Sequence, residues 1–110
     1  MTQLQHRWQH ELAQLPQDQA LAVVRKEVTA IDHQLIRLLQ QRFEAVKAIG
    51  AIKAQQAQPV RDFQREDAVL ADVVGQLSDP ALAAHFQAIF TTIMQESRRV
   101  QTSQREEGVK

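Results

Sequence analysis

Apolar residues recur at helical spacing along most of the chain. Within residues 18–57 they alternate steps of three and four residues: Leu21, Val24, Val28, Ile31, Leu35 and Leu38. This heptad spacing predicts a single long helix, because no Pro interrupts the segment before Pro59 and its only Gly is Gly50. A helix of about 38 residues would extend about 57 Å at 1.5 Å per residue.

Two further helices are predicted after Pro59. The first covers residues 62–77, with Asp62 as its N-cap. The second covers residues 80–104, where Asp79 provides the N-cap and Pro80 occupies the first helical position. Its apolar stripe comprises Leu82, Phe86, Ile89, Phe90 and Ile93. Few Gly and Pro, and no Tyr, argue against a β-sandwich or barrel, so we expect an all-α fold.

The ends of the chain are less regular than its middle. Residues 1–18 carry Leu4, Trp8, Leu12 and Leu15 at helical spacing, which fits either a short helix or a frayed arm. His6 and His10 are four residues apart, but no third ligand accompanies them, so we expect no metal site. We expect one domain over residues 19–104, preceded by an N-terminal extension over 1–18 and followed by a polar, fraying tail over 105–110.

The length of the first helix predicts an oligomer. A compact chain of this size has a radius of gyration of only about 13 Å. The long helix therefore outruns the globule that its own chain can build, and its apolar seam needs a cover. A second copy of the chain is the simplest cover, so we expect an obligate homodimer of three-helix chains.

The composition of the chain argues against several classes of protein. The chain has 13 Lys and Arg against 13 Asp and Glu, a formal net charge of zero, which argues against a nucleic-acid-binding protein. It contains no Cys, which excludes disulfides and thiolate chemistry. No apolar run approaches the length of a membrane span, and the N-terminus lacks the apolar core of a secretory signal. We therefore expect a cytoplasmic protein.

Polar residues interrupt the apolar pattern of each helix. Arg42 continues the seam of the long helix where a Leu is expected, and Lys53, eleven residues on, shares its face. Arg25 is rotated to the side and lies about 25 Å away along the axis at 1.5 Å per residue, so it suits the site of a partner chain better. Two cations on one inward face are suited to a ligand with two negative groups.

The other two helices show similar breaks. Ser97 and Gln101 continue the last apolar stripe, and Asp62, Arg65 and Glu66 share the first turns of the short helix. Taken one at a time, these residues fit ordinary structural roles, such as a snorkelling Arg, the end of a stripe or a cap. Taken together they suggest an internal polar pocket, because buried cations require compensating charge.

The chemistry available to such a pocket is limited. There is no Cys, and Ser97 has no His beside it at helical spacing. No phosphate-binding Gly-rich loop or zinc motif occurs. The pocket is therefore suited to binding, or to a reaction that needs only orientation and electrostatic stabilisation.

These residues carry a family resemblance. Over about residues 21–104 the chain resembles the all-helical, AroQ-type chorismate mutases in the order and spacing of Arg25-x5-Ile31-Asp32-x2-Leu35-x2-Leu38-Leu39-x2-Arg42, Lys53, Pro59-Val60-Arg61-Asp62-x2-Arg65-Glu66 and Ser97-x3-Gln101. The resemblance implies an intertwined homodimer of three-helix chains that rearranges chorismate to prephenate on the route to phenylalanine and tyrosine. It implies no metal and no cofactor.

The resemblance also implies a role for each residue. Arg42, and Arg25 from the partner chain, would bind the two substrate carboxylates. Lys53 would contact a carboxylate and the ether oxygen whose bond breaks, and Gln101 would donate to that same oxygen. The remaining residues would bind the ring hydroxyl (Glu66, with the backbone near Asp62) and complete the carboxylate site (Arg65 and Ser97). We expect Arg42, Lys53 and Gln101 to be catalytic.

Two alternatives remain open. A lyase of the same fold, which removes pyruvate from isochorismate, would share the Arg, Lys and Gln residues. The segment from Arg61 to Glu66 favours the mutase. A catalytically silent helical interaction protein is the third possibility, but the complete set of pocket residues argues against it. The extension over residues 1–18 is too short for a fused enzyme, so we expect a stand-alone mutase.

Overall fold

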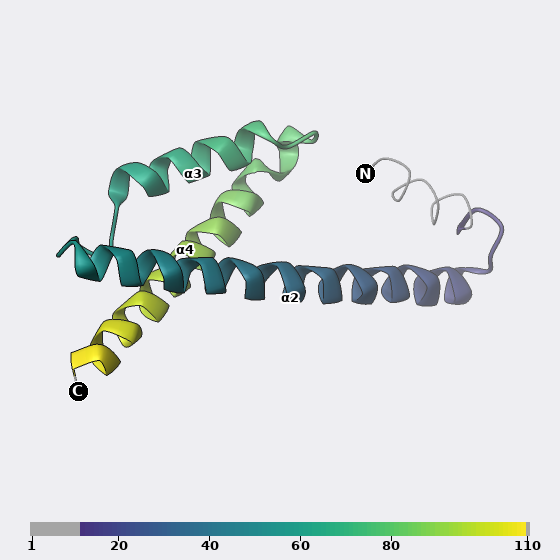
Figure 1. The fold of residues 1–110 in the computed structure, drawn as a ribbon. Coiled ribbons are helices and arrows are strands. Elements are labelled where there is room, and N and C mark those ends of the chain that lie inside the picture. Colours follow the sequence, from purple (N-terminus) through teal and green to yellow (C-terminus); the bar gives the residue numbers. More distant parts are fainter. Residues whose placement is uncertain (1–11, 110) are drawn as a thin grey trace. The chain divides into compact units, whose positions relative to one another are not determined.

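The structure, a computed structural model, describes residues 12–109 and is built from helices (Figure 1). They are α2 (Gln17–Gln55), α3 (Phe63–Gly75) and α4 (Ala83–Val109), with a short 3-10 turn, η1 (Pro80–Leu82), before α4. No strand occurs within residues 12–109. The predicted all-α fold with three helices, one of them very long, is thus confirmed. The N-terminal positions Leu4 and Trp8 and the pair His6 and His10 lie outside the described residues.

The chain divides into two compact units, Met1–Gln41 and Arg42–Lys110, and α2 contributes to both. In the first unit, the predicted seam of α2 is largely exposed in the single chain. About half of the surface or more is accessible at several seam residues, from 49% at Leu35 to 61% at Leu38. Each such half-exposed apolar side chain forgoes roughly half of the about 1.5–3 kcal/mol that burial of a fully exposed side chain would bring.

In the second unit, α2 ends in a motif that reverses the chain. The amide of Gln58 donates to the carbonyl of Lys53 at 2.8 Å, and the amide of Ala57 donates to that of Ala54 at 3.2 Å. Ala57 adopts a left-handed conformation with φ of 55°, a position that usually carries Gly. Pro59 then prevents the helix from continuing. This sharp end brings residues 60–62 back beside the last turns of α2.

The predicted caps of the later helices are present. The Asp62 carboxylate accepts from the backbone amide of Arg65 at 2.9 Å at the start of α3. That of Asp79 accepts from the amide of Ala81 at 3.0 Å at the start of η1. Each carboxylate satisfies an amide that has no partner within its own helix.

The bounds of the last helix differ from the prediction. Pro80–Leu82 form the 3-10 turn, so the α-helix begins three residues later than expected. It also continues to Val109 rather than ending at 104. Arg105 contributes to this extension, because its guanidinium donates to the carbonyl of Gln58 in the turn after α2.

The second unit has a small core. Val46 on α2 and Met94 on α4 are its buried apolar side chains within the described residues. Gly50 is also buried, and α4 packs against α3. Part-buried apolar residues surround this core: Val69, Leu70, Val73, Val74, Phe86, Phe90 and Ile93.

None of the helices within residues 12–109 combines the length and apolar character needed to cross a membrane.

Candidate functional site

A hollow of about 290 Å³ lies within the second unit, where the C-terminal part of α2 meets α3 and α4. It is lined by polar and apolar side chains from all three helices and from the connection between α2 and α3: Arg42, Val46, Ile49, Lys53, Val60, Asp62, Arg65, Glu66, Val69, Met94, Arg98 and Gln101. Its volume is close to the lower limit of the range for small-molecule sites, about 300–1,000 Å³. We call this hollow the central pocket.

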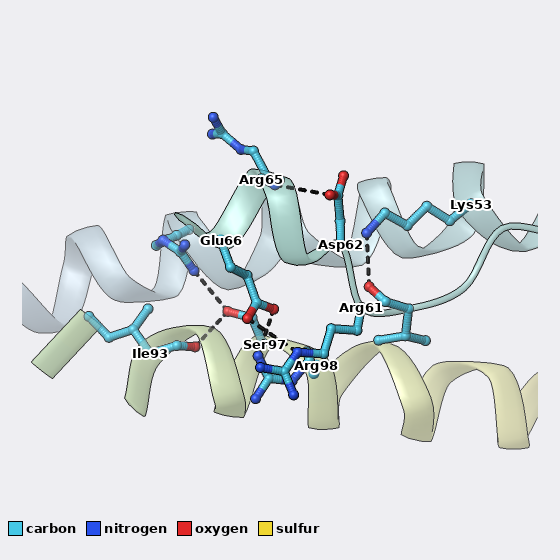
Figure 2. A network of polar contacts seen from close by, with 10 residues as sticks. Lys53, Arg61, Asp62, Arg65, Glu66, Ile93, Ser97 and Arg98 are labelled. Carbon is cyan, nitrogen blue, oxygen red and sulfur yellow. Dashed lines mark hydrogen bonds and ion pairs between the residues drawn. The ribbon is translucent and has the colours of Figure 1, made fainter. Parts of the chain in front are cut away.

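Arg42 is fixed by a hydroxyl and not by a carboxylate. Its Nη1 donates to Ser97 Oγ at 2.8 Å, and that hydroxyl donates in turn to the Ile93 carbonyl at 2.7 Å (Figure 2). Burial away from water lowers the pKa of Arg42, and the nearby positive charge of Arg65 lowers it further. Both causes mean that the charged guanidinium is destabilised in this position. A bound anion would relieve that cost.

Lys53 is also held by a neutral partner. Its Nζ donates to the carbonyl of Val60 at 2.9 Å, across the turn that follows α2 (Figure 2). An ammonium group carries three donors, and this contact uses one of them. The remaining donors are available to a ligand in the central pocket, which Lys53 lines.

Arg65 is the third cation of this kind. Its backbone amide is bound by the Asp62 carboxylate, while its side chain points away from the other residues drawn in Figure 2. Among the described residues of the second unit, no carboxylate lies within ion-pair distance of Arg42, Lys53 or Arg65. Three of the pocket's cations therefore make no ion pair with a carboxylate of the described residues.

Glu66 is paired with a different set of cations. Its Oε2 accepts from Arg98 Nη1 at 2.6 Å, and its Oε1 lies 3.5 Å from Arg61 Nε (Figure 2). The Glu66 side chain is 15% exposed and that of Arg98 is 24% exposed. The guanidinium of Arg61 also lies over the ring of Phe63, 4.1 Å from its centre. Glu66 is thus held on two sides.

The charges around the central pocket do not balance. Four cationic side chains line it, Arg42, Lys53, Arg65 and Arg98, against the two carboxylates of Asp62 and Glu66. The excess of two positive charges is a local property, because the whole chain is neutral. A dianion of small size would complete the balance.

Gln101 provides a buried amide at the same place. Only 6% of its surface is exposed, its Nε2 donates to the carbonyl of Val46 at a long 3.4 Å, and its Oε1 has no partner. Buried polar atoms without partners are rare and costly, about 1–3 kcal/mol each. Nε2 carries two N–H groups and this contact uses one of them, so the other can donate to a ligand, whereas the unpartnered Oε1 can only accept.

The position of Gln101 depends on Gly50. A Cβ at residue 50 would lie 3.0 Å from Cγ of Gln101 and 2.7 Å from Oε1 of Gln104. Both distances are shorter than ordinary van der Waals contacts. The end of the flexible Gln104 side chain could swing away, but Gln101 would have to move by a few tenths of an ångström.

The residues singled out in the sequence fall into three groups. Six line the central pocket: Arg42, Lys53, Asp62, Arg65, Glu66 and Gln101. Ser97 is buried behind it and binds Arg42. Arg25 belongs to the first unit, on the N-terminal part of α2, where its side chain is exposed.

Sequence reasoning missed Arg98 and Gly50. Arg98 lies one turn after Met94 on the inward side of α4, a spacing that was visible in the sequence. Its pairing with Glu66 on α3 was not visible, because the two residues are 32 positions apart. Gly50 was noted only as the one Gly in the segment predicted to form the long helix.

Other features of the described residues offer no comparable site. Hollows of about 480 and 470 Å³ run along the C-terminal half of α4 and are lined mostly by side chains of that one helix. Within the described part of the chain, no group of three or more His, Asp or Glu residues could hold a metal ion.

Comparison with known proteins gives one match. The family model for chorismate mutase type II matches residues 24–102, which is more than two thirds of the chain and includes every residue placed in or behind the central pocket. Comparison with curated proteins and with solved structures finds no significant match.

Proposed function

The chain belongs to the chorismate mutase type II family, and from this premise we propose that it converts chorismate to prephenate. The reaction is an intramolecular Claisen rearrangement, in which a carbon–oxygen bond of the ether breaks while a carbon–carbon bond forms. The observation that carries the proposal is the set of three cations, Arg42, Lys53 and Arg65, that share one pocket and have no carboxylate partner in the described unit. Chorismate brings two carboxylates, which would supply the missing negative charge.

The family resemblance assigns each residue a role, and the arrangement of the pocket side chains supports it. Arg42, held in place by Ser97, binds one substrate carboxylate through its free guanidinium donors. Lys53 contacts a carboxylate and the ether oxygen. Gln101 donates its amide to the same oxygen, where negative charge develops as the bond breaks. Donors aimed at developing charge contribute on the order of 3 kcal/mol each in comparable sites.

The remaining groups complete the substrate site. Glu66, a carboxylate with lone pairs to spare after binding Arg98 and Arg61, accepts a hydrogen bond from the ring hydroxyl. The backbone near Asp62 binds the same hydroxyl, and Arg65 adds positive charge beside Arg42. No covalent intermediate is required, so catalysis is by orientation and electrostatic stabilisation.

We further propose that the enzyme is a cytoplasmic, intertwined homodimer in which Arg25 of each chain completes the partner's site. The exposed seam of α2 supports this, because a second copy would bury it. Residues 19–104 would form the catalytic domain, with residues 1–18 as an extension. The product would enter the synthesis of phenylalanine and tyrosine.

The test is to add purified protein to chorismate and to follow its loss by absorbance, with the product identified by NMR. Prephenate is the expected product. Arg42→Ala should lower kcat/KM by about 100-fold or more, because two or more charge-assisted hydrogen bonds are lost. Lys47→Ala is the matched control on the same helix, since Lys47 pairs with the exposed Glu44 and should leave kcat/KM unchanged.

Other outcomes would point elsewhere. Release of pyruvate from isochorismate, without turnover of chorismate, would identify the lyase of the same fold. If neither substrate is converted by a folded protein, the enzymatic proposal is wrong and a binding role remains.

A further inference from the structure

The carboxylates and cations of the central pocket are segregated. Glu66 pairs with Arg98 and Arg61, whereas Arg42 and Lys53 bind only a hydroxyl and a backbone carbonyl. Glu66 lines the same small pocket as these two cations and Arg65. A carboxylate of this kind would ordinarily pair with whichever cation is closest and best oriented, and it would then compete with an anionic ligand.

The two partners of Glu66 hold it with unequal strength. Arg98 donates from Nη1 at 2.6 Å and is largely buried, whereas the Arg61 contact is 3.5 Å long and about half of that side chain is exposed. A short, desolvated pair is stronger than a long, solvated one. Arg98 is therefore the main anchor of Glu66, and Arg61 is the weaker one.

We propose that Arg98 is a positioning residue that ties Glu66 to the α4 side of the pocket and so keeps Arg42, Lys53 and Arg65 free for the substrate carboxylates. The inference rests on the proposed function for its kinetic test. Arg98 adds nothing to the net attraction for the ligand, because Glu66 neutralises its charge. Its effect is to determine which cations form an ion pair with the Glu66 carboxylate.

The proposal predicts an unusual pattern in a double-mutant cycle. Arg98→Met releases Glu66 to pair with Arg42 or Arg65, so KM for chorismate should rise about tenfold, the size of one partly buried charge–charge interaction. In a Glu66→Gln background there is no carboxylate to misplace. There the same Arg98→Met change should raise KM by no more than about threefold, because it removes only the longer-range attraction between a now unpaired Arg98 and the substrate.

A different effect on KM is expected if Arg98 acts only through its own positive charge. If Arg98 merely attracts the dianion, its removal raises KM by the same factor in both backgrounds, and the proposal is then wrong. It is also wrong if Arg98→Met leaves KM unchanged or lowers only kcat. Arg98→Lys should keep KM near the parent value, because an ammonium group can still pair with Glu66.

Arg99→Met is the matched control for these variants. Arg99 is the next residue on α4, carries the same charge and pairs with Glu96, but it is mostly exposed and lies outside the central pocket. Its replacement should leave KM unchanged. Thermal unfolding of every variant shows whether the fold is kept, and Arg98→Gln replaces Arg98→Met in the cycle if the latter does not fold.

A crystal structure of Arg98→Met provides a readout that does not depend on turnover. The Glu66 carboxylate should lie within 4 Å of a guanidinium nitrogen of Arg42 or Arg65. A carboxylate that stays in its original place, bound by Arg61 alone, contradicts the proposal. If the parent protein does not convert chorismate, the proposed function fails, and this structure still decides the role of Arg98.

Discussion

Gln101 is a neutral donor in a place where a charged one would be unstable. It is almost fully buried, it lies beside the pocket cations, and its amide is only weakly bonded within the chain. In the proposed mechanism it donates to the ether oxygen at any pH, because a carboxamide does not titrate. The neighbouring Lys53 supplies the charged donor to the same atom.

Gln101→Glu should therefore make the reaction depend on pH. Only the protonated carboxyl can donate, so activity should be highest at low pH and should fall as the pH rises through the pKa of the new carboxyl. Burial raises that pKa and the pocket cations lower it, but the direction of the profile is the same in either case. Above the pKa, kcat should decline about tenfold per pH unit.

The measurement is kcat/KM for chorismate between pH 4.5 and 8.5 for the parent and the variant. Glu96→Gln is a suitable control, because Glu96 is an α4 residue paired with the exposed Arg99 and should not change the profile. A flat profile for Gln101→Glu would remove Gln101 from the ether oxygen.

Some residues of the central pocket could be identified from the sequence alone, and others could not. Arg42, Ser97 and Gln101 were identifiable because each replaces an apolar residue in a helical stripe, and the structure places all three at or behind one pocket. The pairing of Arg98 with Glu66 was not identifiable in this way. It depends on how α3 and α4 pack, and helical periodicity carries no information about contacts between separate helices.

At the scale of the helices, most helix ends lie close to the Pro and Asp residues that predicted them in the sequence. Pro59, Asp62 and Asp79 mark where helices end or begin, and the structure has breaks and caps at these positions. The end of α4 was predicted too early. Polar composition suggested fraying, but the contact between Arg105 and the Gln58 carbonyl supports the last turns, and that contact is tertiary.

The absence of a side chain at Gly50 affects both the packing of α4 against α2 and the position of Gln101. Gly50→Ala should improve the intrinsic helix propensity of α2 by about 1 kcal/mol. The new Cβ would nevertheless press on Gln101 Cγ, which lies 3.0 Å away, and displace its amide. The contact requires Gln101 to move by a few tenths of an ångström, and a misplacement of about 1 Å can cost about 100-fold in rate, so we expect kcat to fall about three- to tenfold with little change in KM.

Gly75→Ala is the control for that variant. A Cβ at residue 75, the last residue of α3, would meet nothing within 4 Å, so kcat should not change. In a Gln101→Ala background, Gly50→Ala should cause no further loss of kcat, because the group that it displaces is already absent. A further loss in that background would indicate a general packing defect.

At the scale of the whole molecule, the seam of α2 is the main unsatisfied feature. Leu35 and Leu38 remain half-exposed in the single chain, and within the described residues the second unit buries few apolar side chains of its own. Few proteins of this size are stable with so small a core unless another chain completes it. The proposed homodimer would bury the seam of both copies, and it would also explain why Arg25 lies far along α2 from Arg42.

The sharing of sites between chains can be tested by mixing two inactive variants. In an intertwined dimer, Arg25→Ala and Arg42→Ala chains that are unfolded together and refolded give heterodimers with one intact site and one doubly defective site. Half of the dimers are mixed in a random assembly, so about a quarter of the parent activity should return. Each variant alone should remain inactive and should sediment as a dimer. If Arg25 serves the pocket of its own chain, every site in the mixture lacks one Arg, and no activity returns at any mixing ratio.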